Sequence, residues 1–534
     1  MHGPSEVVDP SQFIWTDGNW NGLELEELIL YELHVGTFSP EGTFNGVRKK
    51  LEHLRGLGIT AIQLMPVADF PGNRGWGYDG VDLFSPARCY GTPDELRQLV
   101  DTAHAMQLSV FLDVVYNHLG PEGAYLGAFS PYYFSSKHKS PWGDAVNLDG
   151  KHCRHVRDFF IENALHWIHE YHIDGLRLDA THAMVDESPI HFLKDLAERV
   201  RCSLPEERTV LLIAEDDRNQ AQLIQPRDQG GYGLDAVWAD DFHHQVRRML
   251  ARDDDGYFQD FTGLAQDLAK TMQQGWFYTG QHSAFRKNPR GTPTDGIPLT
   301  RFVHCIQNHD QIGNRALGDR LNFNVDPASF RAVSALLLLS PATPLIFMGQ
   351  EWAASTPFCY FTDHPEELGK AVTEGRRNEF RHFKAFANPE SRNAIPDPQA
   401  PATFQNCKLN WNERDQEPHS GTLRLYQKLL HLRKTETALK KSENSFFSAE
   451  ALDKNIVAFK RGTSDGASLL VVSCLEGLGS VDLITRPVTQ PPKGTEWRLL
   501  LTTEDDSLAP QWIDKNGIPT LNFQGPCTAV FRAL

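Results

Sequence analysis

Three carboxylates and one arginine stand at the ends of short apolar runs in this sequence. Arg177 and Asp179 close the run GLRLDA, Glu215 lies in VLLIAEDD, and Asp310 closes FVHCIQNHD. An apolar run that ends in a charged residue is typical of a buried strand that delivers a side chain to one edge of a sheet. A single such aspartate is usually a helix cap or a loop acceptor. Its recurrence on three runs favours an acid/base or nucleophile pair that acts on a sugar.

These runs belong to a longer alternation of strand-like and helix-like segments from Leu30 to Glu351. Amphipathic helical patterns such as 93–106 and 156–172 separate most of the strand candidates. Eight units in series predict an α/β fold, a closed (β/α)8 TIM barrel rather than an open doubly wound sheet, with the active site at the C-terminal strand ends. The strand candidates are 29–38, 60–67, 109–118, 175–180, 209–216, 236–243, 301–310 and 343–351.

Segments outside this alternation divide the chain further. Residues 119–155 are rich in Gly, Pro, Ser and aromatic residues, and they predict a loop-rich insertion over the barrel mouth after the third strand. Residues 352–420 are expected to be irregular, 423–440 to form a helix, and the end of the chain to form a small C-terminal antiparallel β domain. The expected domains are a lead-in (1–28), the barrel with its insertion and post-barrel segment (29–440), and the C-terminal β domain (441–534).

The composition narrows the possible partners and the compartment. A net charge of -17 argues against nucleic acid or an anionic membrane as partner. The eight cysteines are scattered and form no CxxC pair, which indicates reduced thiols rather than disulfides or a zinc site. The first residues hold no apolar signal segment, and the longest apolar stretch, ALLLLSPATPLIFM, is short and broken by prolines. We expect a soluble, cytoplasmic protein.

Three further motifs each leave two interpretations open. GWGYDG (75–80) matches the dinucleotide pattern GxGxxG, but Trp76 and Tyr78 stand where a pyrophosphate needs bare backbone. It presents an aromatic platform to a sugar, or it packs a loop. One interpretation of His118 and His309 is that their N–H groups bind sugar hydroxyls. The other is that they are core histidines or metal ligands, although no HExxH spacing supports a metal. ADDFHH (239–244) is a binding segment or a solvated rim.

The motifs DVVYNH (113–118), GLRLDATHA (175–183), IAEDDRN (213–219) and QNHDQIGNR (307–315) resemble the four signature regions of the α-amylase superfamily of glycoside hydrolases. They occur in the family's order, and the resemblance covers essentially the whole chain. Within the superfamily, AEDDRN, NHDQIGNRALGDR, ADDFHH and STPFCYFTDH are similar to malto-oligosyltrehalose trehalohydrolases. A branching enzyme would carry AEES-like and SHDE-like motifs instead.

The resemblance implies that Asp179 is the nucleophile, Glu215 the general acid/base and Asp310 the stabiliser of the transition state, with Arg177 orienting Asp179. It also implies that the substrate is a maltooligosyltrehalose supplied by a synthase, that trehalose is released, and that no cofactor or metal takes part. Members typically begin with an extra β-sandwich, which we expect to be absent or truncated here. The expected substrate-binding residues are Tyr78, His118, Arg177, His182, Asp241, His243, His244, His309 and Gln311.

Three rival functions remain open from the sequence. A branching enzyme or an α-amylase-like hydrolase would use the same carboxylates, and a glucan-binding protein without turnover is the non-enzymatic alternative. A calcium ion held by Asn117 and acids of the 119–155 insertion is a minor alternative to a metal-free site.

Overall fold

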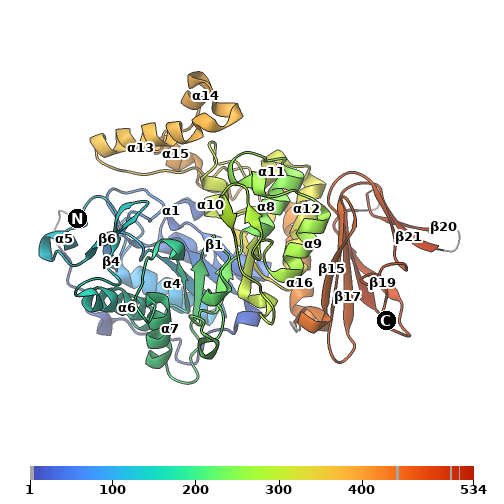
Figure 1. Cartoon of the computed structure of the whole chain (residues 1–534), viewed down its shortest axis with the longest axis horizontal. Helices are drawn as coiled ribbons and strands as arrows, with labels where there is room; N and C mark the ends of the chain where they lie inside the picture. Colours follow the sequence, from blue (N-terminus) through green and yellow to red (C-terminus); the bar gives the residue numbers. More distant parts are fainter. Residues whose placement is uncertain (1–4, 441–443, 506–507, 516–517) are drawn as a thin grey trace. The chain divides into compact units, whose positions relative to one another are not determined.

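The computed structural model describes residues 5–440, 444–505, 508–515 and 518–534 (Figure 1). Eight strands form a closed barrel. Neighbouring strands pair in parallel, with Leu30 opposite Ala61 and Asp113 opposite Arg177. Each of the eight strand candidates contains one barrel strand, so the predicted TIM barrel is confirmed. In barrel order the strands are β1 (Leu30–Leu33), β2 (Ala61–Leu64), β5 (Ser109–Val114), β8 (Gly175–Leu178), β9 (Leu211–Glu215), β10 (Ala236–Trp238), β13 (Phe302–Cys305) and β14 (Thr343–Phe347).

Burial on both faces explains the apolar runs of the barrel strands. Every residue of β1, β2, β5, β8, β13 and β14 is buried. The neighbours of β8 approach so closely that its first residue must be glycine: a Cβ on Gly175 would lie 2.1 Å from the ring of Phe111 and 2.7 Å from the carbonyl oxygen of Leu211. This close packing positions the end of β8, where Arg177 lies.

The helices between the strands follow the predicted pattern. Helix α4 (Pro93–Ala105) begins with a capping box, in which the Thr92 side chain accepts from the Glu95 amide and the Glu95 side chain accepts from the Thr92 amide. Helix α6 (Cys153–Glu170) covers nearly all of the second predicted helix. Helices α7 (Phe192–Ser203) and α12 (Pro327–Leu339) lie farther along the chain.

The insertion after β5 is loop-rich, as predicted, and it also contains short regular elements. It holds a short helix, α5 (Leu126–Phe129), and an antiparallel pair, β6 (Phe134–Ser140) with β7 (Gly143–Val146). The strand β6 has the sequence FSSKHKS, and only one of its residues is buried. It therefore lacks the alternation of apolar and polar residues that identifies a half-buried strand.

The prediction that residues 352–420 are irregular is wrong. They contain α13 (Glu366–Glu379), α14 (Pro389–Asn393) and α15 (Pro401–Asn406). Only Gly369 and Arg376 of α13 are buried, so the helix shows no apolar stripe in the sequence. Its first turn is acidic and its last turn basic, which complements the helix dipole.

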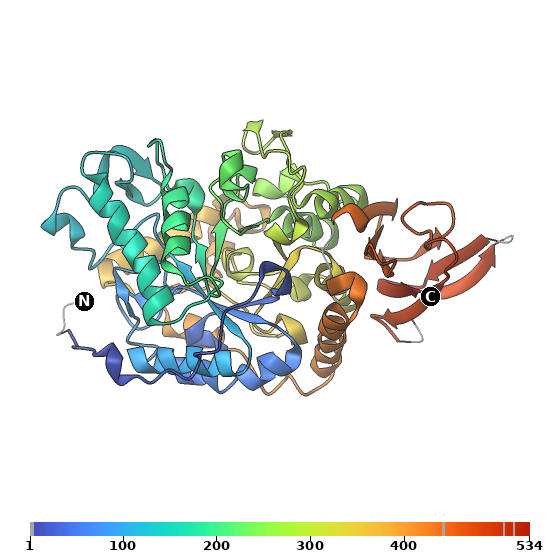
Figure 2. The same cartoon turned by 90° about the horizontal axis from the view of Figure 1, so that it is seen from below.

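The end of the chain forms the predicted antiparallel β domain, drawn in red in Figures 1 and 2. It follows α16 (His419–Thr435) and α17 (Thr437–Lys440). One sheet has the order β15-β16-β17-β22-β19 and a second has β18-β21-β20. The strands are β15 (Phe447–Asp453), β16 (Ile456–Gly462), β17 (Ser468–Cys474), β18 (Gly479–Asp482), β19 (Trp497–Thr502), β20 (Gln511–Lys515), β21 (Ile518–Phe523) and β22 (Cys527–Ala533).

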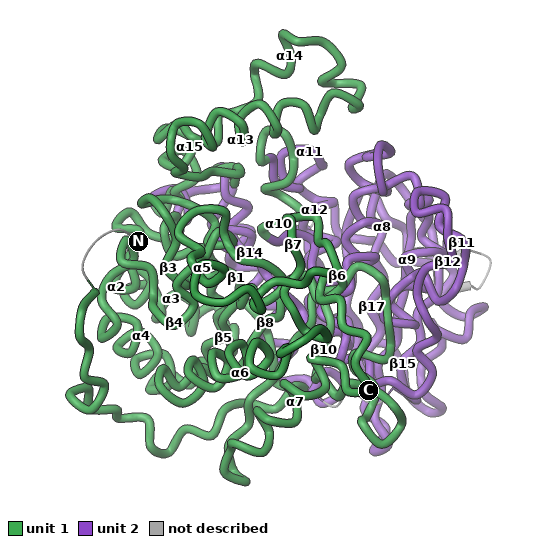
Figure 3. The backbone as a smooth tube through the Cα atoms, turned by 60° about the vertical axis from the view of Figure 1, so that its left-hand side comes forward, with its two compact units in different colours: residues 1–238, 309–318, 356–411 green, residues 239–308, 319–355, 412–534 purple. Residues whose placement is uncertain are grey.

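The chain divides into two compact units, coloured in Figure 3. The first comprises 1–238, 309–318 and 356–411, and the second comprises 239–308, 319–355 and 412–534. Arg177 and the three predicted catalytic carboxylates all belong to the first unit. None of the helices in the described part of the chain has the length and apolar character that a transmembrane span needs.

Candidate active site

Arg177 is the centre of the cluster and lies near the end of β8. Its side chain is fully buried. Its Nη1 donates to both carboxylate oxygens of Asp113, each at 2.9 Å, and to Oδ1 of Asp179 at 2.6 Å. Charge-assisted hydrogen bonds of this kind are about twice as strong as neutral ones. The arginine thus ties the end of β5 to the residue that follows β8.

Asp179 is held from two sides. Arg177 donates to its Oδ1, and the Asn117 Nδ2 donates to its Oδ2 at 2.7 Å and to its carbonyl oxygen at 2.9 Å. The Asp179 amide donates to the Val114 carbonyl at 3.1 Å. Because both carboxylate oxygens have a donor, the plane of the carboxylate is set, as a nucleophile requires.

Glu215 ends β9 and is oriented by the backbone that follows Asp179. The Ala180 amide donates to Glu215 Oε2 at 2.7 Å. Ala180 adopts a left-handed conformation, with φ 41° and ψ 53°, which residues with a Cβ rarely do. Strain of this kind is typical of functional sites. The Nη2 of Arg177 lies 3.7 Å from the same Oε2, so one guanidinium faces both Asp179 and Glu215.

Asp310 lies in α10 (His309–Gly313) and is the most open of the three carboxylates. Its side chain is 37% exposed, and its Oδ2 lies 3.8 Å from the Nη2 of Arg177 and 3.4 Å from the Nε2 of His309. The structure therefore brings Asp179, Glu215 and Asp310 together around Arg177. An accessible carboxylate beside two oriented ones leaves one open side for a substrate.

His309 begins a chain of hydrogen bonds that runs behind the carboxylates. Its Nδ1 lies 2.7 Å from Glu32 Oε1, and its Nε2 lies 2.6 Å from the Tyr78 hydroxyl, which donates to Asp113 Oδ2 at 2.6 Å. Burial alone would lower the pKa of His309, but the carboxylates of Asp310 and Glu32 outweigh it and raise the pKa to about 9. At neutral pH both ring nitrogens therefore donate.

Asp113, at the far end of that chain, is buried and was not among the predicted site residues. Burial raises the pKa of Asp113 to about 7, although the Arg177 guanidinium opposes the rise. The sequence signal that could have found it is the charged residue inside the otherwise apolar run SVFLDVV. Its role is to anchor Arg177 and Tyr78.

In the motif GWGYDG, one aromatic residue packs the loop and the other lies at the carboxylate cluster. Trp76 is buried: its Nε1 donates to the Cys359 carbonyl at 3.0 Å, and its ring stacks on Phe358 at 5.3 Å. Trp76 therefore packs the loop. Tyr78 is half-buried, stacks on His309 with ring centroids 5.3 Å apart, and belongs to the carboxylate cluster.

His118 joins the cluster through Asn117, and Trp142 extends it. The His118 Nδ1 contacts the Asn117 Oδ1, and its Nε2 lies 3.1 Å from the Tyr78 carbonyl oxygen. Burial lowers the pKa of His118, so the ring is neutral at pH 7. Trp142, at the turn between β6 and β7, stacks on His118 at 4.5 Å and is 51% exposed. The only signal for Trp142 in the sequence is its place in an aromatic-rich insertion.

Comparison with known proteins agrees with this geometry. Residues 8–144 match the family model "Alpha amylase, catalytic domain". A malto-oligosyltrehalose trehalohydrolase of Deinococcus radiodurans is 45% identical over 508 residues, which cover 94% of this chain and 81% of that protein. The chain belongs to the malto-oligosyltrehalose trehalohydrolase family.

A second trehalohydrolase, from Arthrobacter ramosus, is 45% identical over 465 residues, covering 86% of this chain and 79% of that protein. A crystal structure of a Salmonella typhimurium protein assigned to the alpha amylases is 37% identical, with a TM-score of 0.88 over 100% of this chain and 86% of its own. This family member is thus an α-amylase-type glycoside hydrolase, as the motifs predicted.

The segment ADDFHH does not form a solvated rim in this family member. Asp241, His243 and His244 are buried in α8 (Asp241–Leu250), within the second unit. Asp241 Oδ2 accepts from the amides of Phe277 and Tyr278, and Arg290 lies 2.9 Å from Asp241 Oδ1. Their assignment to substrate binding stays a prediction.

The last two predicted residues lie beside the cluster in sequence. His182 follows Ala180 in the short helix η3 (Thr181–Ala183), and its half-exposed ring lies 3.9 Å from Asp217. Gln311 follows Asp310 in α10 and is half-buried. Both belong to the first unit, and their contacts with substrate also stay a prediction.

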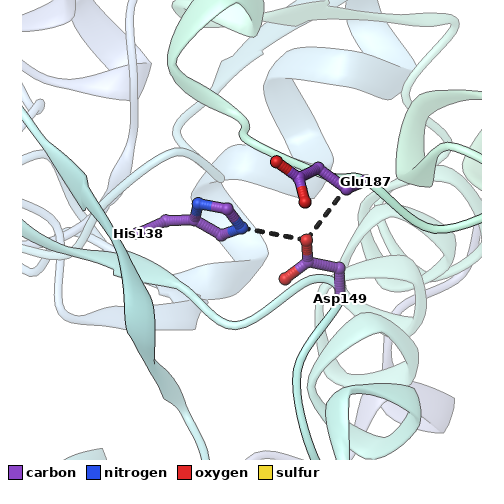
Figure 4. Close-up of side chains that lie close together, drawn as sticks. All are labelled: His138, Asp149 and Glu187. Carbon is purple, nitrogen blue, oxygen red and sulfur yellow. Dashed lines mark hydrogen bonds and ion pairs between the residues drawn. The ribbon is translucent and has the colours of Figure 1, made fainter.

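A trio of potential metal ligands lies outside the carboxylate cluster: His138 and Asp149 belong to the insertion, and Glu187 belongs to the segment before α7 (Figure 4). His138 Nε2 and the Glu187 amide both donate to Asp149 Oδ2, at 2.9 Å and 3.1 Å. The ammonium of Lys137 contacts Asp149 at 3.6 Å and also pairs with Glu187. One side-chain cation, Lys137, thus already contacts both carboxylates, and the trio ties β6 to the segment before α7. Asn117, the residue considered for calcium from the sequence, uses its amide nitrogen on Asp179 and its amide oxygen on His118.

Proposed function

We propose that this protein hydrolyses the α-1,4 bond next to the trehalose end of a maltooligosyltrehalose and releases free trehalose. The observation that carries the proposal is the pairing of Asp179, oriented by Arg177 and Asn117, with Glu215, oriented by the Ala180 amide. The names of the relatives indicate the substrate, and the carboxylate cluster indicates the type of reaction.

In the proposed first step, Asp179 attacks the anomeric carbon while Glu215 gives its proton to the glycosidic oxygen. The bond between that carbon and that oxygen breaks, and trehalose leaves. Asp310 stabilises the positive charge that develops at the anomeric carbon in the transition state, and Arg177 keeps Asp179 oriented for attack. The maltooligosaccharide stays attached to Asp179 as a glycosyl ester.

In the second step, ionised Glu215 takes a proton from a water molecule, whose oxygen attacks the anomeric carbon. The ester bond to Asp179 breaks, and the sugar is released with retained configuration. Tyr78, His118 and His309 hold the sugar that reacts. No redox or phosphate group is needed, because the reaction only transfers a proton and exchanges one oxygen at carbon.

Product analysis tests the proposal. The purified protein is incubated with maltooligosyltrehalose and, separately, with the matching maltooligosaccharide. We expect free trehalose from the first and much slower hydrolysis of the second. New α-1,6 branches on amylose would identify a branching enzyme, equal hydrolysis of both substrates an α-amylase-like enzyme, and binding without turnover a glucan-binding protein.

The same proposal places the enzyme in a reaction sequence. A synthase that converts the reducing end of a maltooligosaccharide into a trehalose unit must supply this substrate. The eight cysteines are all free thiols, which supports a cytoplasmic location.

A further inference from the structure

Arg177 makes all its hydrogen bonds to the described residues through one nitrogen. Nη1 contacts Asp113, Asp179 and, at 3.5 Å, the Tyr78 hydroxyl. Nε and Nη2 are buried and have no hydrogen-bond partner there. A guanidinium anchored at one nitrogen can pivot about it. Hydrogen bonds alone therefore do not fix where Nη2 points.

The position of Nη2 matters because it faces the two other carboxylates. It lies 3.7 Å from Glu215 Oε2 and 3.8 Å from Asp310 Oδ2. Asp179, in contrast, is held by Nη1 and independently by Asn117. A pivot of the guanidinium would therefore disturb Glu215 and Asp310 while leaving the nucleophile in place.

Trp238 is the group that lies on the face of this guanidinium. It ends β10, directly opposite Glu215 in the parallel register. The Cζ of Arg177 lies 4.5 Å from the centroid of the Trp238 ring. Trp238 is only 4% exposed, and its Nε1 has no hydrogen-bond partner among the described residues. Buried tryptophans usually satisfy that N–H, so this ring contributes its face rather than its donor.

We propose that Trp238 is a positioning residue of the reaction: its indole face holds the guanidinium plane of Arg177 so that Nη2 stays directed at Glu215 and Asp310. A cation over an aromatic face is attracted by the ring quadrupole, and the attraction is strongest where water is excluded. The inference rests on the proposed roles of Asp179 and Glu215. It predicts a specific defect, in which leaving-group protonation suffers and nucleophilic attack does not.

Two substrates separate these steps. Maltooligosyltrehalose has a sugar leaving group that needs a proton, whereas α-maltosyl fluoride releases fluoride with little need for one. We expect Trp238→Leu and Trp238→Met to lower kcat on maltooligosyltrehalose about 30-fold, the loss of one desolvated cation–π contact. Their rate of fluoride release from α-maltosyl fluoride in the first turnover, before Glu215 is needed as base, should fall less than about threefold. Trp238→Phe keeps an aromatic face and should stay within about fivefold of the parent on both substrates.

Controls distinguish positioning from packing. Trp276 is also fully buried, and its Nε1 donates to the Thr292 carbonyl. Trp276→Leu should change both rates in equal proportion, after correction for folded fraction by circular dichroism. The less disruptive Trp238→Met covers the case in which Trp238→Leu does not fold. Equal losses on both substrates for Trp238→Met, or no loss at all, would overturn the inference.

Two catalytic variants show separately whether the proposed function itself fails. Glu215→Gln should lose turnover of maltooligosyltrehalose but still release about one equivalent of fluoride per enzyme in a first burst, because only the second step with the fluoride needs Glu215 as base. Asp179→Asn should lose both the turnover and the burst. If these variants do not behave so, the assignment of roles fails. If they do and the Trp238 variants show no selective defect, only the role of Trp238 is refuted.

Discussion

At the scale of single residues, the site works because each carboxylate has a different set of neighbours. Asp179 has a donor on each oxygen, Glu215 accepts from a backbone amide, and Asp310 is open. One arginine faces all three. Three carboxylates around one arginine can thus take three roles without differing in chemical type.

The first prediction concerns Asp179. Asp179→Asn keeps the shape and an oxygen for one donor but removes the nucleophilic charge, so kcat should fall by about three orders of magnitude or more. Binding of maltooligosyltrehalose, measured by calorimetry, should persist. A folded variant that keeps more than about 5% of the activity would assign the nucleophile to another residue.

The second prediction concerns pH and His309. Its folded pKa of about 9 lies above the ordinary value of 6.5. Protonated His309 therefore stabilises the folded protein fully below pH 6.5. This contribution to the free energy of unfolding, on the order of 3 kcal/mol, is lost as the pH rises through 9. Neutral His309 also has only one N–H for two acceptors, so activity should fall over the same range. Stability and rate measured from pH 6 to pH 10 check this.

Glu32→Gln tests the cause of that pH dependence. It removes one of the two carboxylates that raise the pKa of His309, so the alkaline loss of activity should begin at lower pH. Glu450→Gln, in the C-terminal sheet, changes the net charge equally and serves as the control. Identical profiles for the two variants would show that Glu32 does not set the protonation of His309.

At the scale of elements, the position of Arg177 depends on how tightly β8 packs. We predict that Gly175→Ala destabilises the protein by about 2 kcal/mol or more, because its Cβ has no room beside Phe111 and Leu211. Gly56→Ala is the matched control: it lies in α3 (Leu51–Leu57) with nothing near its Cβ position, and should stabilise by about 0.5–1 kcal/mol. Urea denaturation measures both.

Helix α8 carries the remaining test of the predicted substrate residues. Asp241→Ala leaves Arg290 without its carboxylate and two amides without their acceptor, so stability should fall by about 3 kcal/mol. If Asp241 also serves selectivity, the ratio of rates on maltooligosyltrehalose and maltooligosaccharide should fall in the folded fraction. An unchanged ratio would make Asp241 a structural residue.

The elements also show what a single sequence can predict. All eight barrel strands could be found, because burial on both faces leaves continuous apolar runs, and the carboxylates at their ends could be found with them. The β6–β7 hairpin and α13 could not, since most of their residues are exposed or half-buried and carry no periodic apolar signal. Trp238 was missed for another reason: within a run such as AVWADD, a core tryptophan and one that faces a charged partner look the same.

At the scale of the whole molecule, the site is assembled from distant parts of one chain. The first compact unit takes residues from three separate segments, and the short segment 309–318 brings Asp310 and His309 to residues from the first 238. The ends of β8 and β9 supply only part of the cluster.

The contact between Glu32 and His309 has a consequence for how the protein is made. The two residues are 277 positions apart. At 5–20 residues per second, the ribosome needs roughly 15–55 s to synthesise the chain between them. Throughout that time Glu32 lacks the imidazolium that accompanies its burial, and a carboxylate is costly to bury alone. The nascent barrel therefore cannot close around β1 until most of the enzyme has emerged, and a chaperone that shelters the open strands has the same roughly 15–55 s in which to act.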